Sequence, residues 1–255
     1  GLDDFSGGVT SSLYASDCAL MTINAQNGVE VGSEIHFRHV EKVNKPMIIA
    51  VNGLDHEKAN FDKCFEMMKE RFSNNVIIVQ YPLNEGAGFN SIIDVLKMKM
   101  LQYAKEGGVA KVTDIPADQK EKAEELHSAL VEKAAESDES LMELFFSNDT
   151  LSEEEIRKGI AKGILTRGMF PVFCTSSKNN IGVDKLMEFI ISEAPSVADM
   201  PAPVNSKGNQ VKADPSGPAS VYVFKSSIEE HIGEINYFRV YSGKIESGQQ
   251  ILNSR

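Results

Sequence analysis

The sequence lacks tryptophan and has only three cysteines among its 255 residues. Cys18, Cys64 and Cys174 are widely spaced in apolar surroundings, which predicts reduced, buried thiols of a cytosolic protein rather than a disulfide framework. Their spacing is not that of a metal site. The longest apolar runs also fall far short of the ~20 residues that a membrane-spanning helix needs, so no membrane partner is expected.

Basic residues are fewer than acidic residues in this sequence. The chain has 26 Lys and Arg against 37 Asp and Glu, a formal net charge of −11. A bulk positive field that attracts nucleic acid is therefore excluded, and any contact with RNA would need a local patch. The hydrophobic content of 42% and the charged content of 25% are typical of a soluble globular protein. A length of 255 residues allows one or two domains.

Short apolar runs alternate with helical patterns along much of the chain. Four runs rich in β-branched residues cover 19–23, 47–51, 76–79 and 171–174. Apolar residues at helical spacing follow in 61–72 and 183–191. This alternation predicts an α/β fold with a parallel sheet and helices on both of its faces.

A long stretch, roughly 82–168, separates the third run from the fourth and exceeds an ordinary crossover connection. Within it, Ser152 and Glu155 form a capping-box pattern at the start of a helix. Apolar residues at helical spacing lie among many acids: Leu126, Leu130, Ala134, Leu141, Phe145, Ile156, Ile160 and Ile164. We predict a helical subdomain whose acidic outer face needs no explanation beyond solvation.

The composition changes after residue 194. Five prolines among small and polar residues predict a linker or an extended crossover over 195–218. Beyond it, 221–224 and 235–241 have the pattern of strands, followed by the turn signals Ser242-Gly243 and Ser247-Gly248. We expect an antiparallel β-domain to begin here, over 219–255, without closing.

Two loops that follow strands carry the residues of a candidate site: Asn52-Gly53-Leu54-Asp55 and Thr175-Ser176-Ser177-Lys178. One carboxylate, such as Asp55, can accept hydrogen bonds from both adjacent N–H groups of a guanine ring, and Asn52 could brace the loop or meet the ring's acceptors. The alternative for the first loop is a plain strand-to-helix turn with Asp55 as an N-cap. Nucleotide sites lie at the carboxyl ends of strands in open α/β sheets, so the two loops together favour guanine binding.

The order and spacing of several short motifs resemble bacterial elongation factor G, a translational GTPase, over nearly the whole chain. Gly1-Leu2-Asp3-Asp4-Phe5 resembles the start of switch II, and Asn52 to Asp55 falls on the guanine loop. Further matching segments are Gly28-Val29-Glu30 with Ser33-Glu34, Asp114-Ile115-Pro116-Ala117 in the insertion, Cys174 to Ser177, and Tyr237-Phe238-Arg239-Val240-Tyr241-Ser242-Gly243.

This resemblance implies a P-loop-type GTPase sheet with its N-terminal part missing, a helical insertion, and the start of an antiparallel β-barrel. A partial GTP-binding domain would cover 1–194, with the insertion at about 82–168, a linker at 195–218, and the start of domain II at 219–255. It further implies a cytoplasmic factor that binds the ribosome, including its stalk proteins and ribosomal RNA, and promotes translocation. Asn52 and Asp55 would recognise guanine, and Ser176 and Ser177 would assist at its carbonyl oxygen.

Two positions depart from the family pattern. Leu2 stands where the family has the His that positions the attacking water, and Gly53 stands where it has Lys. The phosphate-binding pattern Gly-x-x-x-x-Gly-Lys-Ser/Thr is also absent from these residues. GTP or GDP with Mg²⁺ would be the cofactor of the parent protein. The chain as given is expected to bind GTP weakly or not at all and to be inactive. We expect no catalytic residue and no metal ligand in it.

Whether the parent protein hydrolyses GTP is left open by these departures. One alternative is a ribosome-binding factor that acts without hydrolysis, and another is a ribosomal protection factor of the same fold. An acidic α/β interaction module unrelated to translation is the remaining possibility.

Overall fold

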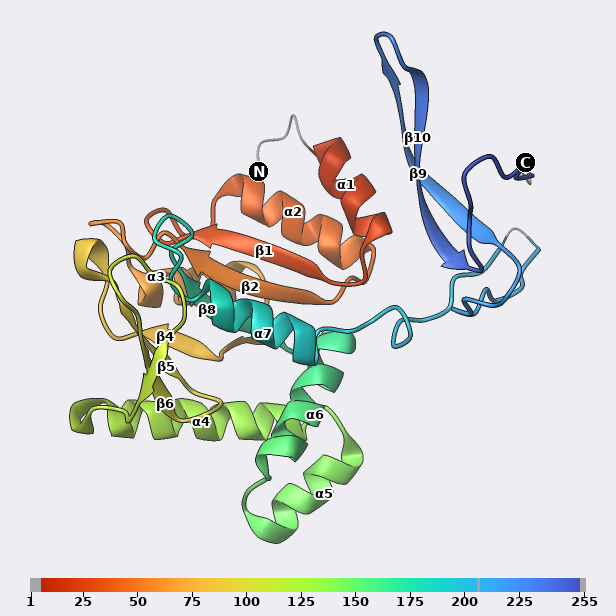
Figure 1. The fold of residues 1–255 in the computed structure, drawn as a ribbon. Coiled ribbons are helices and arrows are strands. Elements are labelled where there is room, and N and C mark those ends of the chain that lie inside the picture. Colours follow the sequence, from red (N-terminus) through yellow and green to blue (C-terminus); the bar gives the residue numbers. More distant parts are fainter. Residues whose placement is uncertain (1–5, 206, 253–255) are drawn as a thin grey trace.

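The computed structural model describes residues 6–205 and 207–252 (Figure 1). The helices are α1 (Ser6–Ala15), α2 (Val31–Lys42), α3 (Phe61–Arg71), α4 (Lys120–Ala135), α5 (Glu139–Asn148), α6 (Glu153–Leu165) and α7 (Val183–Glu193). The strands are β1 (Ala19–Asn24), β2 (Met47–Asn52), β3 (Val76–Ile78), β4 (Gln80–Pro82), β5 (Ser91–Asp94), β6 (Lys99–Gln102), β7 (Lys111–Thr113), β8 (Phe170–Thr175), β9 (Ser220–Glu229) and β10 (Gly233–Ser242). Leu2 and the switch-II-like segment 1–5 lie outside the described residues.

The central sheet is parallel and has the strand order β1-β2-β8-β3. Its two middle strands, β2 and β8, are buried along nearly their whole length, as expected of strands covered on both faces. The helices beside the sheet turn apolar faces inward; Phe61, Cys64 and Met68 of α3, for example, are buried at helical spacing. The predicted α/β fold with a parallel sheet is confirmed.

The insertion is only partly helical, so the sequence prediction for it was incomplete. Its first part is an antiparallel sheet of order β4-β5-β6-β7, packed beside the central sheet. These strands are three or four residues long, too short for an alternating pattern to stand out, and all four residues of β5 are buried. The second part is helical as predicted, and the Ser152–Glu155 capping box is present at the start of α6.

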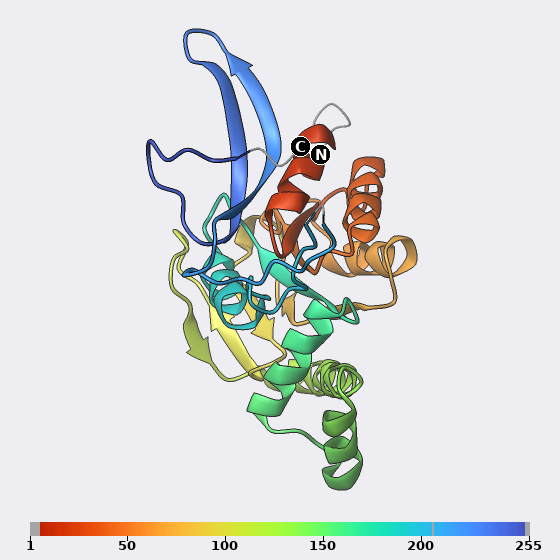
Figure 2. The ribbon, with the colours of Figure 1, turned by 90° about the vertical axis from the view of Figure 1, so that its right-hand side faces the viewer.

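A long irregular segment leads from α7 to the antiparallel hairpin β9–β10. The two views show this hairpin beside α1, at the opposite end of the molecule from α5 (Figures 1 and 2). The strands predicted at 221–224 and 235–241 fall within β9 and β10 and are confirmed.

Burial differs among the cysteines. Cys64 and Cys174 are buried, whereas Cys18 is only partly buried because it lies just before β1 at the edge of the sheet; all three are free thiols. None of the helices in the described part of the chain combines the length and the apolar character needed to cross a membrane.

Candidate guanine-nucleotide site

The two candidate loops meet at one edge of the central sheet. Strand register places Asn52, the last residue of β2, beside Thr175, the last residue of β8. Both loops therefore leave the carboxyl ends of adjacent parallel strands, the position where open α/β sheets bind nucleotides. The structure thus brings together the four residues that the sequence singles out: Asn52, Asp55, Ser176 and Ser177.

Asn52 braces the two loops against one another. Its Oδ1 accepts hydrogen bonds from the Ser177 N–H at 2.9 Å and the Thr175 hydroxyl at 3.3 Å, and its Nδ2 donates to Ser177 Oγ at 3.0 Å. Of the two roles that the sequence left open for Asn52, these contacts match loop bracing. Asn52 Oδ1 already accepts the hydrogen bond from the Ser177 N–H. The role of Ser177 at a guanine carbonyl oxygen therefore stays a prediction.

Asp55 is held by the second loop. The hydroxyl of Ser176 donates to Asp55 Oδ1 over 2.6 Å, and Ser176 Oγ accepts from the Asn179 N–H over 3.2 Å. Ser176 is fully buried, which fixes the direction of its hydroxyl, while Asp55 is half-buried. No other hydrogen bond to this carboxylate comes from the residues that the structure describes, so Asp55 keeps the acceptor capacity that two adjacent guanine N–H groups require.

Gly53 leaves the middle of the first loop open. Its N–H donates to Thr175 O at 3.1 Å, which ties the turn to the second loop. Its φ of +82° lies in the left-handed region, and a Cβ built there would have no atom within 4 Å. A side chain at this position would thus meet space but carry backbone strain.

The second loop folds back on itself directly after β8. Ser176 and Ile181 exchange two backbone hydrogen bonds of 2.9 and 3.0 Å, which closes a tight turn. Gly182 follows with φ +77°, and a Cβ there would lie 2.1 Å from Cys174 O. Only glycine allows this close return of the chain to its own strand.

The insertion supports both loops from behind. The Gly86 N–H donates to Leu54 O at 2.8 Å, and the Gly108 N–H donates to Asn180 O at 3.0 Å. Gly107 packs so closely on the second loop that a Cβ would fall 1.9 Å from Asn179 O. The antiparallel part of the insertion therefore fixes the backbone of the site.

Tyr103 and Asp184 anchor this support. The buried Tyr103 hydroxyl donates to Asp184 Oδ1 over 2.7 Å, and the Ala110 N–H donates to Asp184 Oδ2 over 3.4 Å. Burial, reinforced by the Asp184 carboxylate, raises the pKa of Tyr103 well above its usual value, so the phenol remains a donor at neutral pH. Asp184 is in the first turn of α7, directly after the second loop.

Tyr103 and Asp184 could not be recognised in the sequence, because they are 81 residues apart and neither lies in a motif. The pair Gly107-Gly108 was the one available signal, since adjacent glycines are typical of a close backbone approach. Among the described residues, no group of three or more His, Cys, Asp or Glu side chains is placed to hold a metal ion.

Comparisons with known proteins show the family to which the chain belongs. The family described as the elongation factor Tu GTP binding domain matches residues 1–196. The chain therefore belongs to this family, which places it among the translational GTPases.

Its similar proteins include elongation factor G from two Ureaplasma species. Elongation factor G of Ureaplasma parvum serovar 3 is 35% identical over 256 residues, covering 98% of this chain and 37% of the relative. Elongation factor G of Ureaplasma urealyticum serovar 10 matches with the same identity and coverage. A crystal structure of a Thermus thermophilus protein superposes with a TM-score of 0.82 at 25% identity, covering 98% of this chain and 35% of that one. The chain thus spans 37% of the length of the curated relatives it matches.

Proposed function

We propose that this chain is part of a cytoplasmic, elongation factor G-like protein that binds the ribosome, including its stalk proteins and ribosomal RNA, and promotes translocation. The proposal rests on the similarity to elongation factor G along 98% of the chain. GTP or GDP with Mg²⁺ would be its cofactor, as the family implies. The side chains and backbone groups that bind the phosphates and Mg²⁺ would come from residues other than these 255.

We propose further that guanine recognition is retained but weakened. The single observation that carries this is the Asp55 carboxylate, oriented by Ser176 and still able to accept from guanine, next to Gly53, which has open space and no side chain. In the family pattern, a Lys stem at this position covers the base. Its absence removes apolar contact with the ring without removing the specific acceptor.

A pair of variants of the full-length protein tests this reading. Gly53→Lys and Gly53→Ala both place a side chain at φ +82° and share the backbone strain, but only Lys adds the stem. We expect Gly53→Lys to bind GDP and GTP more tightly than Gly53→Ala, measured by titration with a fluorescent guanine nucleotide. Equal affinities of the two variants would show that the loop does not contribute to a working nucleotide site.

A second candidate function is a ribosome-binding factor that works by occupancy, without GTP hydrolysis. Leu2, in place of the family's His, and Gly53 favour it. Steady-state GTP hydrolysis by the full-length protein with ribosomes separates the two: turnover at the rate of an ordinary elongation factor G would support the first. No turnover, together with ribosome binding that is equal with GTP, GDP or neither, would support the second.

A further inference from the structure

A cavity of about 360 Å³ lies at the other end of the central sheet from the guanine loops. Asp17 and Lys45, two of its lining residues, come two positions before β1 and β2, at the amino ends of these strands. The remaining walls come from the segment after α7 and from β10, which contributes Arg239 and Tyr241. The cavity is thus a separate feature, lined by residues just before β1 and β2, by the segment after α7 and by β10.

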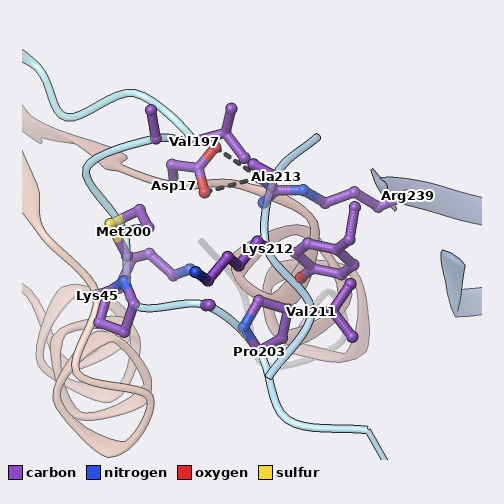
Figure 3. A pocket seen from close by; sticks show the side chains of 13 residues that line it. Asp17, Lys45, Val197, Met200, Pro203, Val211, Lys212, Ala213 and Arg239 are labelled. Carbon is purple, nitrogen blue, oxygen red and sulfur yellow. Dashed lines mark hydrogen bonds and ion pairs between the residues drawn. The ribbon is translucent and has the colours of Figure 1, made fainter. Parts of the chain in front are cut away.

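One ion pair closes the side of the cavity next to α1. Nη2 of Arg239 donates to both carboxylate oxygens of Asp17, each at 2.7 Å, and Nη1 donates to Ala15 O at 3.2 Å (Figure 3). The charge of Asp17 is therefore fully engaged by Arg239, which is itself largely buried. Asp17 is the sole acidic residue in the lining, and its ion pair is with Arg239 rather than with either lysine.

Lys45 and Lys212 extend toward one another from opposite walls (Figure 3). Lys45 Nζ donates to Ser16 O over 2.5 Å and has two further N–H groups, whereas the described residues offer Lys212 no hydrogen bond or ion pair. Lys45 is half-buried, and this burial lowers the pKa of its ammonium group, against the opposing effect of Asp17. Among the described residues, neither lysine thus forms an ion pair with a carboxylate, in a chain with a net charge of −11.

The other walls are mostly apolar. Val197, Met200, Pro201, Pro203 and Val211 line the cavity together with the Tyr241 ring. A volume of a few hundred Å³, apolar walls and a few converging charged groups are the usual composition of a small-molecule site. A phosphate monoester carries close to two negative charges at neutral pH, which matches the two ammonium groups.

From these observations we infer that the cavity binds a small organic phosphate monoester, whose phosphate lies between Lys45 and Lys212 and whose apolar body rests on the proline-lined wall. Such a ligand contacts the amino-terminal edge of the sheet, the linking segment and the hairpin together. Because the guanine loops are at the opposite edge, guanine nucleotides do not compete for this cavity.

Phenyl phosphate is a suitable probe, with calorimetric titration of the full-length protein at pH 7.5. We expect it to bind more tightly than inorganic phosphate, because the ring adds apolar contact. Lys212→Gln and Lys45→Gln should each weaken binding at least fivefold. Lys207→Gln, on the same linking segment but outside the cavity, is the matched control and should leave binding unchanged.

Several outcomes overturn the inference: no binding of phenyl phosphate, equal affinity for inorganic phosphate, equal loss in Lys207→Gln, or displacement of the probe by GTP. Thermal unfolding of each variant without ligand shows whether it is folded. Should Lys45→Gln fail to fold, Lys212→Gln still decides the question, since Lys212 is exposed and its side chain forms no hydrogen bond or ion pair with the described part of the chain. This result is independent of guanine binding, so the two proposals fail separately.

Discussion

The hydroxyl of Ser176 donates a 2.6 Å hydrogen bond to Asp55, and this bond joins the loop after β8 to the loop after β2. Ser176 also accepts from the N–H of Asn179, so one buried oxygen orders both the acidic side chain and the turn of its own loop. The carboxylate proposed to read guanine is thereby oriented by a neighbouring strand end rather than by its own loop.

Replacing Ser176 tests this orientation. Ser176→Ala leaves Asp55 and the Asn179 N–H without their shared partner, so we expect a loss of about 1–3 kcal/mol in unfolding free energy, measured by urea denaturation. Guanine-nucleotide affinity of the full-length protein should fall as well. Ser177→Ala is the matched control: it keeps the backbone bond to Asn52 and should cost no more than about 1 kcal/mol. Equal losses in the two variants would contradict the special role of Ser176.

The support from the insertion depends on the phenol of Tyr103. Tyr103→Phe removes a buried hydrogen bond to a carboxylate, so we expect the unfolding free energy to fall by about 1.5–3 kcal/mol. The folded-state pKa of Tyr103 is raised above 10.0, so its contribution is complete below pH 10 and is lost only as the phenol ionises at higher pH. The difference from the unsubstituted protein should therefore stay constant between about pH 7 and 9. Tyr222→Phe, at an exposed tyrosine, should have little effect.

Gly107 and Gly108 offer a paired test of the close contact between the insertion and the second loop. Both have positive φ, but a Cβ at Gly107 would lie 1.9 Å from Asn179 O, whereas a Cβ at Gly108 would have no atom within 4 Å. We expect Gly108→Ala to cost about 1–2 kcal/mol through backbone strain alone. Gly107→Ala should cost more, by a further ~1–3 kcal/mol, because the loop must move. Thermal denaturation of the two variants under the same conditions measures the difference.

Asp94, the buried last residue of β5, gives a prediction that depends on pH. Burial raises its pKa above 3.8, against the lowering effect of the hydrogen bond from the Lys97 N–H. A raised pKa means that folding is favoured while the group is protonated and that this stabilisation is lost as the pH rises. Asp94→Asn keeps an acceptor for Lys97 and removes the buried charge, so it should be more stable than the unsubstituted protein at neutral pH. The gain should shrink as the pH is lowered toward 3.8.

An exposed carboxylate provides the control for Asp94. A side-chain hydrogen bond from Lys99 lowers the pKa of Asp114, so its contribution to stability is present at neutral pH and lost in acid. Asp114→Asn should therefore change stability in the opposite direction, or not measurably, given that Asp114 is exposed. A stabilising effect of both substitutions would show that charge at Asp94 is not the cause.

The parallel sheet could be predicted from sequence because its strands are uninterrupted apolar runs, such as 47–51 in β2, which have no stable place except a sheet covered on both faces. The antiparallel part of the insertion could not, because β4 and β7 are three residues long and depend on cross-strand neighbours rather than on their own pattern. Tertiary context, not local propensity, makes them strands.

The candidate site, too, could be predicted from the sequence only in part. Asn52, Asp55 and Ser176 could be found because polar residues at the carboxyl ends of strands converge by the geometry of a parallel sheet. The contacts of Tyr103 and of Gly107 with the second loop could not, since nothing in a local sequence window records which distant segment packs against it. The division of the chain into domains at 194 and 218 stays a prediction.

The bond between Ser176 and Asp55 also has a consequence for the order of folding. The two residues are 121 positions apart, and the whole insertion lies between them. Closing so long a loop has an entropic cost that is recovered only when many contacts form together. We therefore expect the loops after β2 and β8 to form late, after the insertion has folded and brought β8 alongside β2.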